Sequence, residues 1–455
     1  MKKYLPVILA LMCLNSVMEA QTLQTAYFSD DFTYSYRLNP AFHPSYSFVG
    51  LPVAGAVSGS YKGDFSLRDL YYKSGGESVT FMNESVSASD FLGNFRKGMN
   101  KFSTESYTNL LAVGFRAGGL YNIVDVNVRN YTSGKLPYDL ARFLKEGASG
   151  EGSYDLSGLK AHTTSFFELG ITSSWKATRK LTVGMRFKGV IGFVNSYIDM
   201  DKWTISASGN KWSVSSEGVV AAAYDGLSIA GTPSYQDPSV ELIDFRHTKV
   251  GKPKGLMNGY GVGADVGILY DDSSWQISAS VSDIGCVFWF HNLYGHAPSG
   301  SKTYTASYTP HHHSGETIDN EFSDMGALLG DAMPFIMEDE NQSLGLLPLT
   351  ARFGVKYLYL SDLSFGGLAT FRYNDICPFW EARGSVNYRP VKQVELVGSL
   401  GLGSLGICAG LFANAHLGFV NVFAGTDNLV GTSGSAFIPS TKGSPNFVAG
   451  LNIAW

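Results

Sequence analysis

The clearest pattern in this chain is a strict alternation of apolar and polar positions. In the segment 181–188, the odd positions are Leu, Val, Met and Phe, and the even positions are Thr, Gly, Arg and Lys. A period of two places successive side chains on opposite faces of a β-strand. The segment is therefore expected to form a strand with one apolar and one polar face.

Four further segments follow the same rule, at 260–271, 275–282, 351–359 and 363–373. Strands of about 10 residues cross a bilayer at a tilt, whereas a typical globular strand has about 5 to 6 residues. A soluble β-sandwich also alternates, so alternation alone leaves that class open. No apolar run after residue 20 is long enough for a membrane helix, so a chain that spans a bilayer must close its strands into a barrel.

The spacing of the strands separates short connections from long ones. We count sixteen candidate strands, and every second connection between them is short, at 118–119, 177–179, 209–210, 271–273, 361–362, 390–391 and Asn414. The long connections fall in between, at 61–105, 131–160, 224–255, 290–347 and 425–445. Outer-membrane barrels have short periplasmic turns and longer outer loops. The predicted fold is all-β, a transmembrane antiparallel β-barrel of 14–16 strands.

Both ends of the chain indicate export to an outer membrane. Residues 1–20 combine two lysines, an uncharged stretch and a final Ala20, which predicts a secretory signal peptide. The barrel is expected over 46–455, and its last strand has one apolar face made of Phe447, Ala449, Leu451, Ile453 and Trp455. That face resembles the terminal strand by which outer-membrane barrels are recognised for assembly. The expected partners are therefore outer-membrane lipids and the barrel assembly machinery.

Composition narrows the alternatives further. The chain has 52 Gly, 7 Trp, 25 Tyr and 29 Phe against 16% charged residues, with a net charge of −5 and no basic run. No Pro/Ser-rich linker divides it, so a single large unit is expected, and no nucleic-acid partner is implied. After the signal peptide the cysteines are Cys286, Cys377 and Cys408, an odd and widely spaced set that does not form a disulfide framework.

Polar faces of the predicted strands must line the interior if the apolar faces meet lipid. An Arg or Lys exposed to lipid at the bilayer midplane costs about 2–4 kcal/mol. The predicted lumen-facing residues are Arg116, Arg186, Lys188, Asp265, Arg352, Lys356, Arg372 and Glu395. They form either a conduction pathway or a structural network of paired charges. On this assignment Phe187→Arg should impair assembly, whereas Lys188→Gln should leave it nearly intact.

Residues 21–45 are too rich in proline for a central strand, so they form either a periplasmic tail or a segment that folds into the barrel mouth. Asn39-Pro40-Ala41 resembles the hatch motif near the mature start of FadL/PorV-type barrels. The segments 38–42, 282–285, near a strand end, and 425–429 in the last loop resemble an uncharacterised outer-membrane barrel family related to that group. The resemblance implies a hatch at Asn39, Pro40 and Ala41, fourteen strands, and transport of apolar molecules or a partner role in secretion.

Short helices are expected inside the long loops. Ser89 is a candidate cap for a helix over 90–101, and Pro137 for a short helix that ends before Gly147. A third apolar stripe recurs at helical spacing over 318–329. These helices either pack the loops against the barrel rim or form a lid that gathers a ligand.

Candidate chemistry is sparse. His311, His312 and His313, with Glu316 and Asp319, carry metal-binding groups, but consecutive histidines rarely all face one ion, so no metal site is expected. No Gly-x-Ser-x-Gly motif is present, so no enzyme activity and no cofactor are expected. The leading hypothesis is a passive transporter or channel for small or apolar molecules. The alternatives are a non-transporting scaffold that binds a secreted or surface protein, and a barrel hydrolase.

Overall fold

A computed structural model describes residues 23–74, 77–147, 152–208, 211–234, 238–245, 247–255, 257–298, 301–305, 335–339, 342–404, 406–429 and 446–455. The predicted signal peptide at 1–20 lies outside these residues. In the part of the chain that is described, no helix has the length and apolar character needed to cross a membrane.

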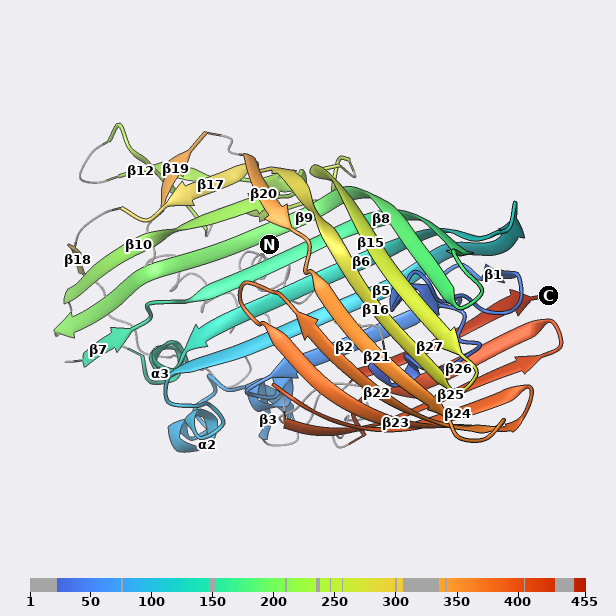
Figure 1. Cartoon of the computed structure of the whole chain (residues 1–455). Coiled ribbons are helices and arrows are strands. Elements are labelled where there is room, and N and C mark those ends of the chain that lie inside the picture. Colours follow the sequence, from blue (N-terminus) through green and yellow to red (C-terminus); the bar gives the residue numbers. More distant parts are fainter. Residues whose placement is uncertain are drawn as a thin grey trace.

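The described strands close into an antiparallel barrel of fourteen strands (Figure 1). Its wall begins with β1 (Phe48–Gly50) and β2 (Val57–Gly63), which share one wall position. The wall continues through β5 (Met99–Ala117), β6 (Leu120–Pro137), β8 (Lys160–Lys176), β9 (Leu181–Ser208), β15 (Gly259–Asp272), β16 (Trp275–Phe290), β21 (Thr350–Leu358), β22 (Leu363–Arg372), β23 (Phe379–Val391), β24 (Val394–Gly403), β25 (Gly406–Leu417), β26 (Val420–Thr426) and β27 (Asn446–Ala454). β27 pairs with both β26 and β1/β2, which closes the wall. The predicted fold class is confirmed.

The count of sixteen strands was two too high. The outer half of β9 is the continuation of a wall strand and not a separate one, and β10 (Lys211–Ala223) pairs with that outer half beyond the wall. Neither segment adds a strand to the wall. The same outer sheet includes β7 (Gly152–Asp155), β12 (Gly231–Pro233), β13 (Glu241–Ile243), β17 (Leu293–His296), β18 (Ser301–Thr305) and β19 (Ile336–Glu338). β20 (Gln342–Leu346) pairs with the outer end of β16, and two small ribbons are made by β3 (Tyr71–Ser74) with β4 (Glu77–Thr80) and by β11 (Leu227–Ser228) with β14 (Lys249–Val250).

Six short connections lie together at one end of the barrel, which we call the turn end; the opposite end is the loop end. They follow β5, β8, β15, β21, β23 and β25. The prediction of a turn at Asn414 is wrong: Asn414 lies within β25 opposite Glu395, and the chain reverses at Gly418, whose φ is 64°. A left-handed φ favours glycine, which has no Cβ to clash. The predicted turn at 209–210 lies outside the described residues.

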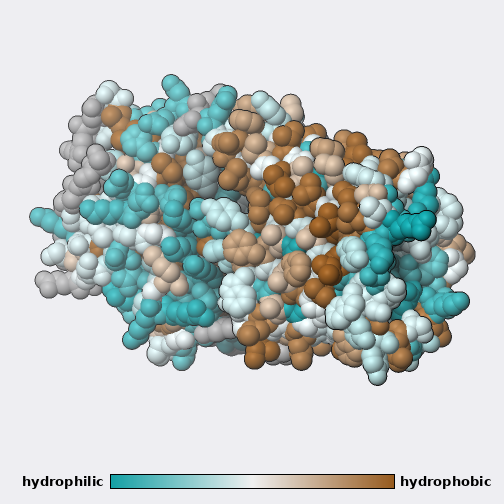
Figure 2. All heavy atoms as spheres, viewed as in Figure 1, coloured by the Kyte–Doolittle hydropathy of each residue, from teal (hydrophilic) through white to brown (hydrophobic). Residues whose placement is uncertain are grey.

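The outer face of the barrel carries the apolar positions. Phe187 is 61% exposed, Phe353 53% and Leu400 67%. Figure 2 shows a broad hydrophobic area on one face of the molecule, with more hydrophilic surface toward both ends. An apolar surface of this extent is not stable in water and is the lipid-facing belt of a transmembrane barrel.

The helices are short. The 3-10 turns are η1 (Gln24–Ala26), η2 (Ser35–Arg37) and η3 (Leu67–Leu70). The helix predicted from Pro137 is confirmed as α3 (Tyr138–Glu146), which ends at Gly147. The helix predicted over 90–101 is shorter in the structure: α2 covers Ala88–Leu92, and its cap is Ser87, whose side chain accepts from the Asp90 amide, not Ser89. Residues from Met99 onward are not helical because they pair with β6.

Residues 23–47, which we call the plug, fold back inside the barrel near the turn end (blue in Figure 1). Their aromatic and aliphatic side chains join inward residues of the wall in one buried cluster, which includes Phe32, Tyr34 and Tyr36 of the plug and Phe412 and Phe423 of the wall. Phe32 lies edge-on to both wall rings, at 5.2 and 5.0 Å between centroids. A second cluster fills the loop end under α2, α3 and β10.

Candidate functional site

The Asn-Pro-Ala segment of the plug lies against the wall at β15 and β16. Asn39 is fully buried. Its Nδ2 donates to the carbonyl oxygens of Ile268 and Ala279, at 3.1 and 3.3 Å, and its Oδ1 accepts from the Ala41 amide at 2.9 Å. Asparagine is suited to this position because its side-chain amide has both a donor and an acceptor. The oxygen can accept from the backbone two residues later while the NH2 group donates to a neighbouring segment.

Two glycines make room for that segment. Gly184 of β9 and Gly267 of β15 face each other in register. A Cβ at Gly184 would overlap the Pro40 carbonyl carbon, and a Cβ at Gly267 would overlap the Asn39 Oδ1. The wall therefore has a glycine notch that accepts residues 39–41, since any larger side chain would expel them.

Polar side chains of the wall hold the start of the plug. Asp427 accepts from the amides of Gln24 and Thr25, at 2.9 and 2.7 Å, and from the Thr25 hydroxyl at 2.6 Å. The Thr25 hydroxyl also lies 2.8 Å from the Ser399 Oγ. The start of the plug is thus bonded to β24 and to the loop following β26.

The middle of the plug is held by ion pairs nearer the turn end. Lys356 Nζ lies 2.6 Å from the Asp30 carboxylate, and Arg389 contacts Asp30 at 3.2 Å and Asp31 at 2.6 Å. Glu395 accepts from the Ser29 hydroxyl at 2.5 Å. These contacts use side chains that project inward from β21, β23 and β24.

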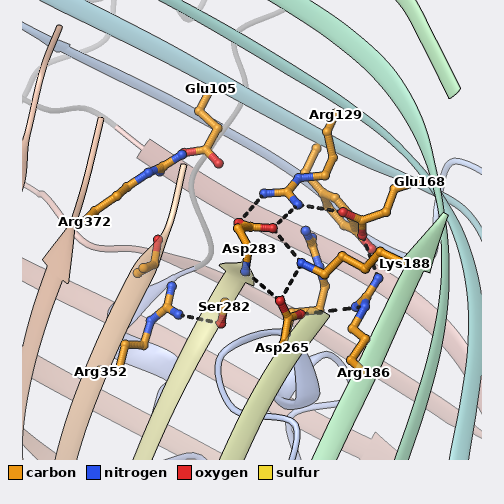
Figure 3. A pocket seen from close by; sticks show the side chains of 13 residues that line it. Glu105, Arg129, Glu168, Arg186, Lys188, Asp265, Ser282, Asp283, Arg352 and Arg372 are labelled. Carbon is orange, nitrogen blue, oxygen red and sulfur yellow. Dashed lines mark hydrogen bonds and ion pairs between the residues drawn. The ribbon is translucent and has the colours of Figure 1, made fainter. Parts of the chain in front are cut away.

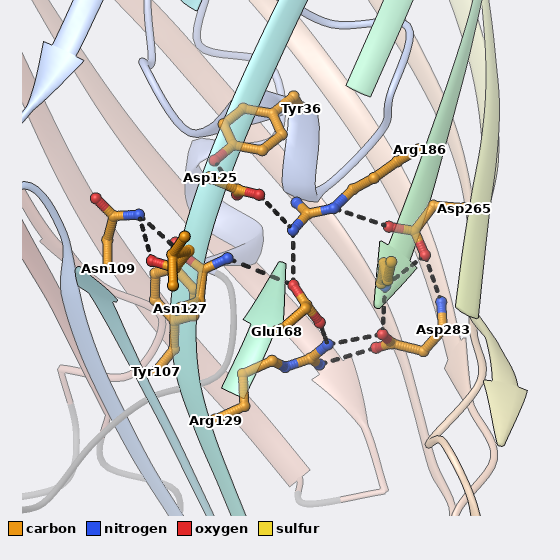
Figure 4. A network of polar contacts seen from close by, with 12 residues as sticks. Tyr36, Tyr107, Asn109, Asp125, Asn127, Arg129, Glu168, Arg186, Asp265 and Asp283 are labelled. Atoms are coloured by element: carbon orange, nitrogen blue, oxygen red, sulfur yellow. Dashed lines mark hydrogen bonds and ion pairs between the residues drawn. The ribbon is translucent and has the colours of Figure 1, made fainter. Parts of the chain in front are cut away.

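A network of buried charges lies next to the plug, on the side of the loop end (Figure 4). Arg129 lies 2.6 Å from Glu168 and 2.7 Å from Asp283, and Arg186 lies 2.6 Å from Glu168 and 3.0 Å from Asp125. All five residues are at most 7% exposed. Buried charges of this kind are stable only when each has partners, because removing an ion from water costs several kcal/mol.

Lys188 completes the network by joining β15 to β16. Its Nζ lies 2.6 Å from both Asp265 and Asp283. Replacement of Lys188 by Gln would leave two buried carboxylates short of a cation, so it should lower the stability of the folded protein. Nearly intact membrane assembly of Lys188→Gln stays a prediction.

Plug and network meet at one hydroxyl. The Tyr36 hydroxyl donates to Asp125 at 2.6 Å, as Figure 4 shows. Burial, and secondarily the Asp125 carboxylate, raises the pKa of Tyr36 well above its usual range, so this hydroxyl stays a hydrogen-bond donor.

Asp283 occupies an irregular point of the wall. Its φ is 62°, a left-handed value that few residues other than glycine, Asn and Asp adopt. β16 pairs with β21 as far as Ser282 and with β20 from Cys286 onward, so Asp283 lies between two registers. The amide of Asp283 donates to Asp265 at 2.6 Å. The segment 282–285, expected near a strand end, lies instead inside β16.

Little empty space remains in the lumen at this level. A cavity of about 30 Å³ lies among Arg129, Glu168, Lys188, Asp283, Arg352 and Arg372 (Figure 3). That is about the volume of one water molecule, whereas an apolar cavity that binds benzene measures about 150 Å³. Among the described residues, the plug and the network thus fill the lumen at this level.

Comparison with known proteins places the chain in a family. The profile of DUF5723, described as a family of unknown function, matches residues 40–427. The chain belongs to the DUF5723 family. This confirms the expected membership of an uncharacterised family. No curated protein matches this DUF5723 chain.

Two solved structures show low similarity to the DUF5723 chain. The Pseudomonas putida toluene transporter TodX is 9% identical, with 97% of this chain and 95% of that chain covered and a TM-score of 0.43. A Pseudomonas aeruginosa FadL homologue is 11% identical, covering 96% and 99%, with a TM-score of 0.42. The fourteen-strand fold of the DUF5723 chain is established by its own strand pairing.

The predicted lumen-facing residues of the DUF5723 chain fall into three groups. Arg186, Lys188 and Asp265 lie in the charge network, and Arg372 pairs with Glu105 beside it. Arg352, Lys356 and Glu395 contact the plug. Arg116 differs, because it is exposed at the turn end of β5, 5.3 Å from the Tyr121 ring.

Four members of the network were missed. Asp125 and Arg129 lie in β6, where polar inward positions alternate with Val124, Val126 and Val128, so the same period of two could have found them. Glu168 precedes the outward Leu169 in the same manner. Asp283 has no such signal, because the irregularity in β16 puts it on the same side as its neighbour Ser282, and both are buried.

The other sequence features fall partly outside the described residues, including the histidines at 311–313, Glu316, Asp319 and the apolar stripe at 318–329. Within the described ranges, no group of three or more His, Cys, Asp or Glu is placed to hold a metal ion. Cys286, Cys377 and Cys408 are free thiols. Phe447, Ala449, Leu451, Ile453 and Trp455 form β27 and its end, and the Trp455 and Ser47 backbones exchange two hydrogen bonds of 2.9 Å.

Proposed function

We propose that this protein is a non-enzymatic, gated outer-membrane channel for small molecules, closed in the present conformation by its own plug. Apolar molecules are the substrate class that the resemblance to FadL-type barrels implies. The observation that carries the proposal is that a segment outside the wall fills the lumen.

Barrel size makes that segment necessary. An eight-stranded barrel is just wide enough for its own side chains to fill, whereas barrels of 16 to 18 strands leave an aqueous channel. A fourteen-strand wall therefore encloses a lumen that requires additional material to close it. Here the additional material continues into the wall only at β1, so its displacement leaves all fourteen wall positions intact.

The contacts of the plug are of a kind that can be exchanged. Hydrogen bonds to Asp427 and Glu395 and ion pairs with Lys356 and Arg389 can be replaced by bonds to water. A hydrogen bond to a charged group contributes about 1.5–3 kcal/mol, so a ligand or a partner that competes for a few of these contacts shifts the equilibrium toward an open state.

A disulfide lock tests the gate. The Thr25 and Ser399 hydroxyls are 2.8 Å apart, so T25C/S399C should couple plug and wall in a background that lacks Cys286, Cys377 and Cys408. Single-channel conductance in planar bilayers and solute uptake into liposomes are measured before and after reduction. The oxidised variant should be silent, and reduction should restore conductance and uptake.

A matched control cross-links two wall strands. The Thr132 and Thr163 hydroxyls lie 3.1 Å apart on β6 and β8, so T132C/T163C introduces a disulfide that leaves the plug free and should conduct in both redox states. Deletion of 21–45 should raise conductance. If neither the reduced protein nor the deletion variant passes ions or solutes, the channel proposal fails.

One observation favours a second candidate, a scaffold that binds a secreted or surface protein. β9 has 28 residues, and its outer half joins β10, α2 and α3 around a core that contains the buried Trp203 and Trp212. A folded unit of this size exceeds what is needed to connect barrel strands. Cross-linking on intact cells followed by purification should recover one stable protein partner, and recovery of none would count against the scaffold.

A further inference from the structure

A basic loop lies at the outer margin of the apolar belt. Lys249 is the first residue of β14, Lys252 and Lys254 follow in the segment before β15, and all three are exposed. Together with residues of β11 they line an open groove of about 400 Å³. The groove is distinct from the lumen, because its lining includes no residue of the plug or of the charge network.

Backbone and side-chain bonds fix the loop in place. The Gly251 amide donates to the Gly226 carbonyl oxygen at 2.7 Å, and the Tyr224 hydroxyl donates to the Gly251 carbonyl oxygen at 2.9 Å. The Gly255 amide donates to the Asp225 carboxylate. Lys249 therefore lies in a short two-stranded ribbon, and Lys252 and Lys254 lie in the hydrogen-bonded loop that follows it.

The belt begins directly after this loop. Tyr260, the second residue of β15, is 53% exposed. Its ring centroid lies 5.8 Å from that of Phe288 and 5.6 Å from that of Phe290, and both phenylalanines are also exposed. Aromatic side chains gather at the interface between hydrocarbon and water in membrane barrels. Lys254 precedes Tyr260 by six positions along the chain, which favours a position for this loop at the outer edge of the belt, where lipid headgroups lie.

Charge in the groove is strongly positive. Three lysines and one carboxylate, Asp225, line it, which gives 3 − 1 = +2. The Asp225 carboxylate is engaged by the Gly255 amide. Clusters of lysine immediately outside a membrane span bind anionic lipid headgroups.

We propose that Lys249, Lys252 and Lys254 bind the phosphate groups of a phosphorylated glycolipid of the outer leaflet, of the lipid A class. The inference rests on the outer-membrane location in the proposed function and not on channel activity. A glycolipid with acyl chains on an amino-sugar phosphate fits, because its acyl chains meet the belt at Tyr260 while its phosphates meet the lysines above.

Native mass spectrometry of the full-length protein in detergent tests the proposal. Diphosphoryl lipid A, dephosphorylated lipid A and inorganic phosphate are titrated separately. The wild type should retain diphosphoryl lipid A at least about tenfold more strongly than the dephosphorylated form. K249S/K252S/K254S should lose that preference and retain both forms equally.

The matched control removes the same charge at the turn end. Lys176, Arg179 and Lys180 are exposed there, and K176S/R179S/K180S should bind like the wild type. Equal retention of diphosphoryl lipid A by both triple variants would overturn the proposal, and so would tight binding of inorganic phosphate alone, which indicates a free-anion site. Conductance of K249S/K252S/K254S should match the wild type, so failure of the lipid site and failure of the channel are distinguishable.

Discussion

Neighbouring residues on one strand of this barrel meet opposite environments. Phe187 is 61% exposed on the lipid-facing side, whereas Lys188 is buried between two carboxylates. A change of one position therefore exchanges hydrocarbon for a dense ionic interior. Single substitutions should have effects that depend on face and depth rather than on residue type.

Phe187→Arg tests the lipid-facing assignment. A cation at mid-belt costs about 2–4 kcal/mol, and the cost falls to about 0–1 kcal/mol near the interface. Phe187→Arg should thus slow or prevent assembly into lipid vesicles. Assembly is measured by the mobility shift of folded barrels on unheated gels. Tyr359→Arg, at an exposed position next to the end of β21, is the control and should assemble normally.

Arg186→Leu tests the charge network. It would leave Asp125 and Glu168, both about 1% exposed, short of a cation, and breaking a buried pair in this way costs about 3–5 kcal/mol. The loss of stability is measured as the change in the free energy of unfolding, from urea titration of the protein in vesicles. Lys180→Ala, which breaks the exposed pair with Asp272, should cost far less, because water screens an exposed ion pair. Equal losses in the two variants would mean that the network contributes no special stability.

At the scale of elements, the plug and the wall fit each other through small residues of the wall. Inward glycines lie beneath the plug at several points, with Gly354 and Gly366 under Phe28 and Gly184 and Gly267 under residues 39–41. The wall would also close with larger residues at these positions if the plug were not there. The glycines leave room for plug residues, so substitutions at these positions should affect gating more than assembly.

Gly184→Ala tests this fit. The added methyl group overlaps Pro40, so the plug should be displaced while the barrel still assembles, which gives faster proteolysis of residues 23–45 and higher conductance. Gly189→Ala on the same strand is the control, because a Cβ there meets nothing within 4 Å. Identical behaviour of the two variants would show that the notch does not hold the plug.

At the scale of the whole molecule, closure depends on the last strand. β27 pairs with β26 on one side and with β1 and β2 on the other, so the wall becomes continuous only when the C-terminus is in place. Trp455 is 65% exposed and bonds Ser47 through its backbone. Its side chain is thus available to the assembly machinery that the sequence predicts as a partner.

Trp455→Ala tests that role. The backbone bonds to Ser47 remain, so the stability of the folded barrel should change little, whereas the rate of assembly in cells should fall severalfold. Pulse-labelling with the gel-shift assay measures the rate. Phe419→Ala, which removes an aromatic side chain that is 71% exposed at the same end, should assemble at the wild-type rate.

The sequence by itself determined the barrel class and the facing of most strands, because a period of two is a local property and contact with hydrocarbon selects one face of each strand. It also excluded residues 21–45 from the wall, through prolines that no central strand tolerates, and left open whether they form a periplasmic tail or enter the barrel mouth. Tertiary structure alone decided the strand number, since β10 alternates like a wall strand but pairs beyond the wall. It alone decided the closed lumen as well: Arg129 and Asp283 are 154 positions apart, and their contact depends on register, a bulge and a plug that no local pattern encodes.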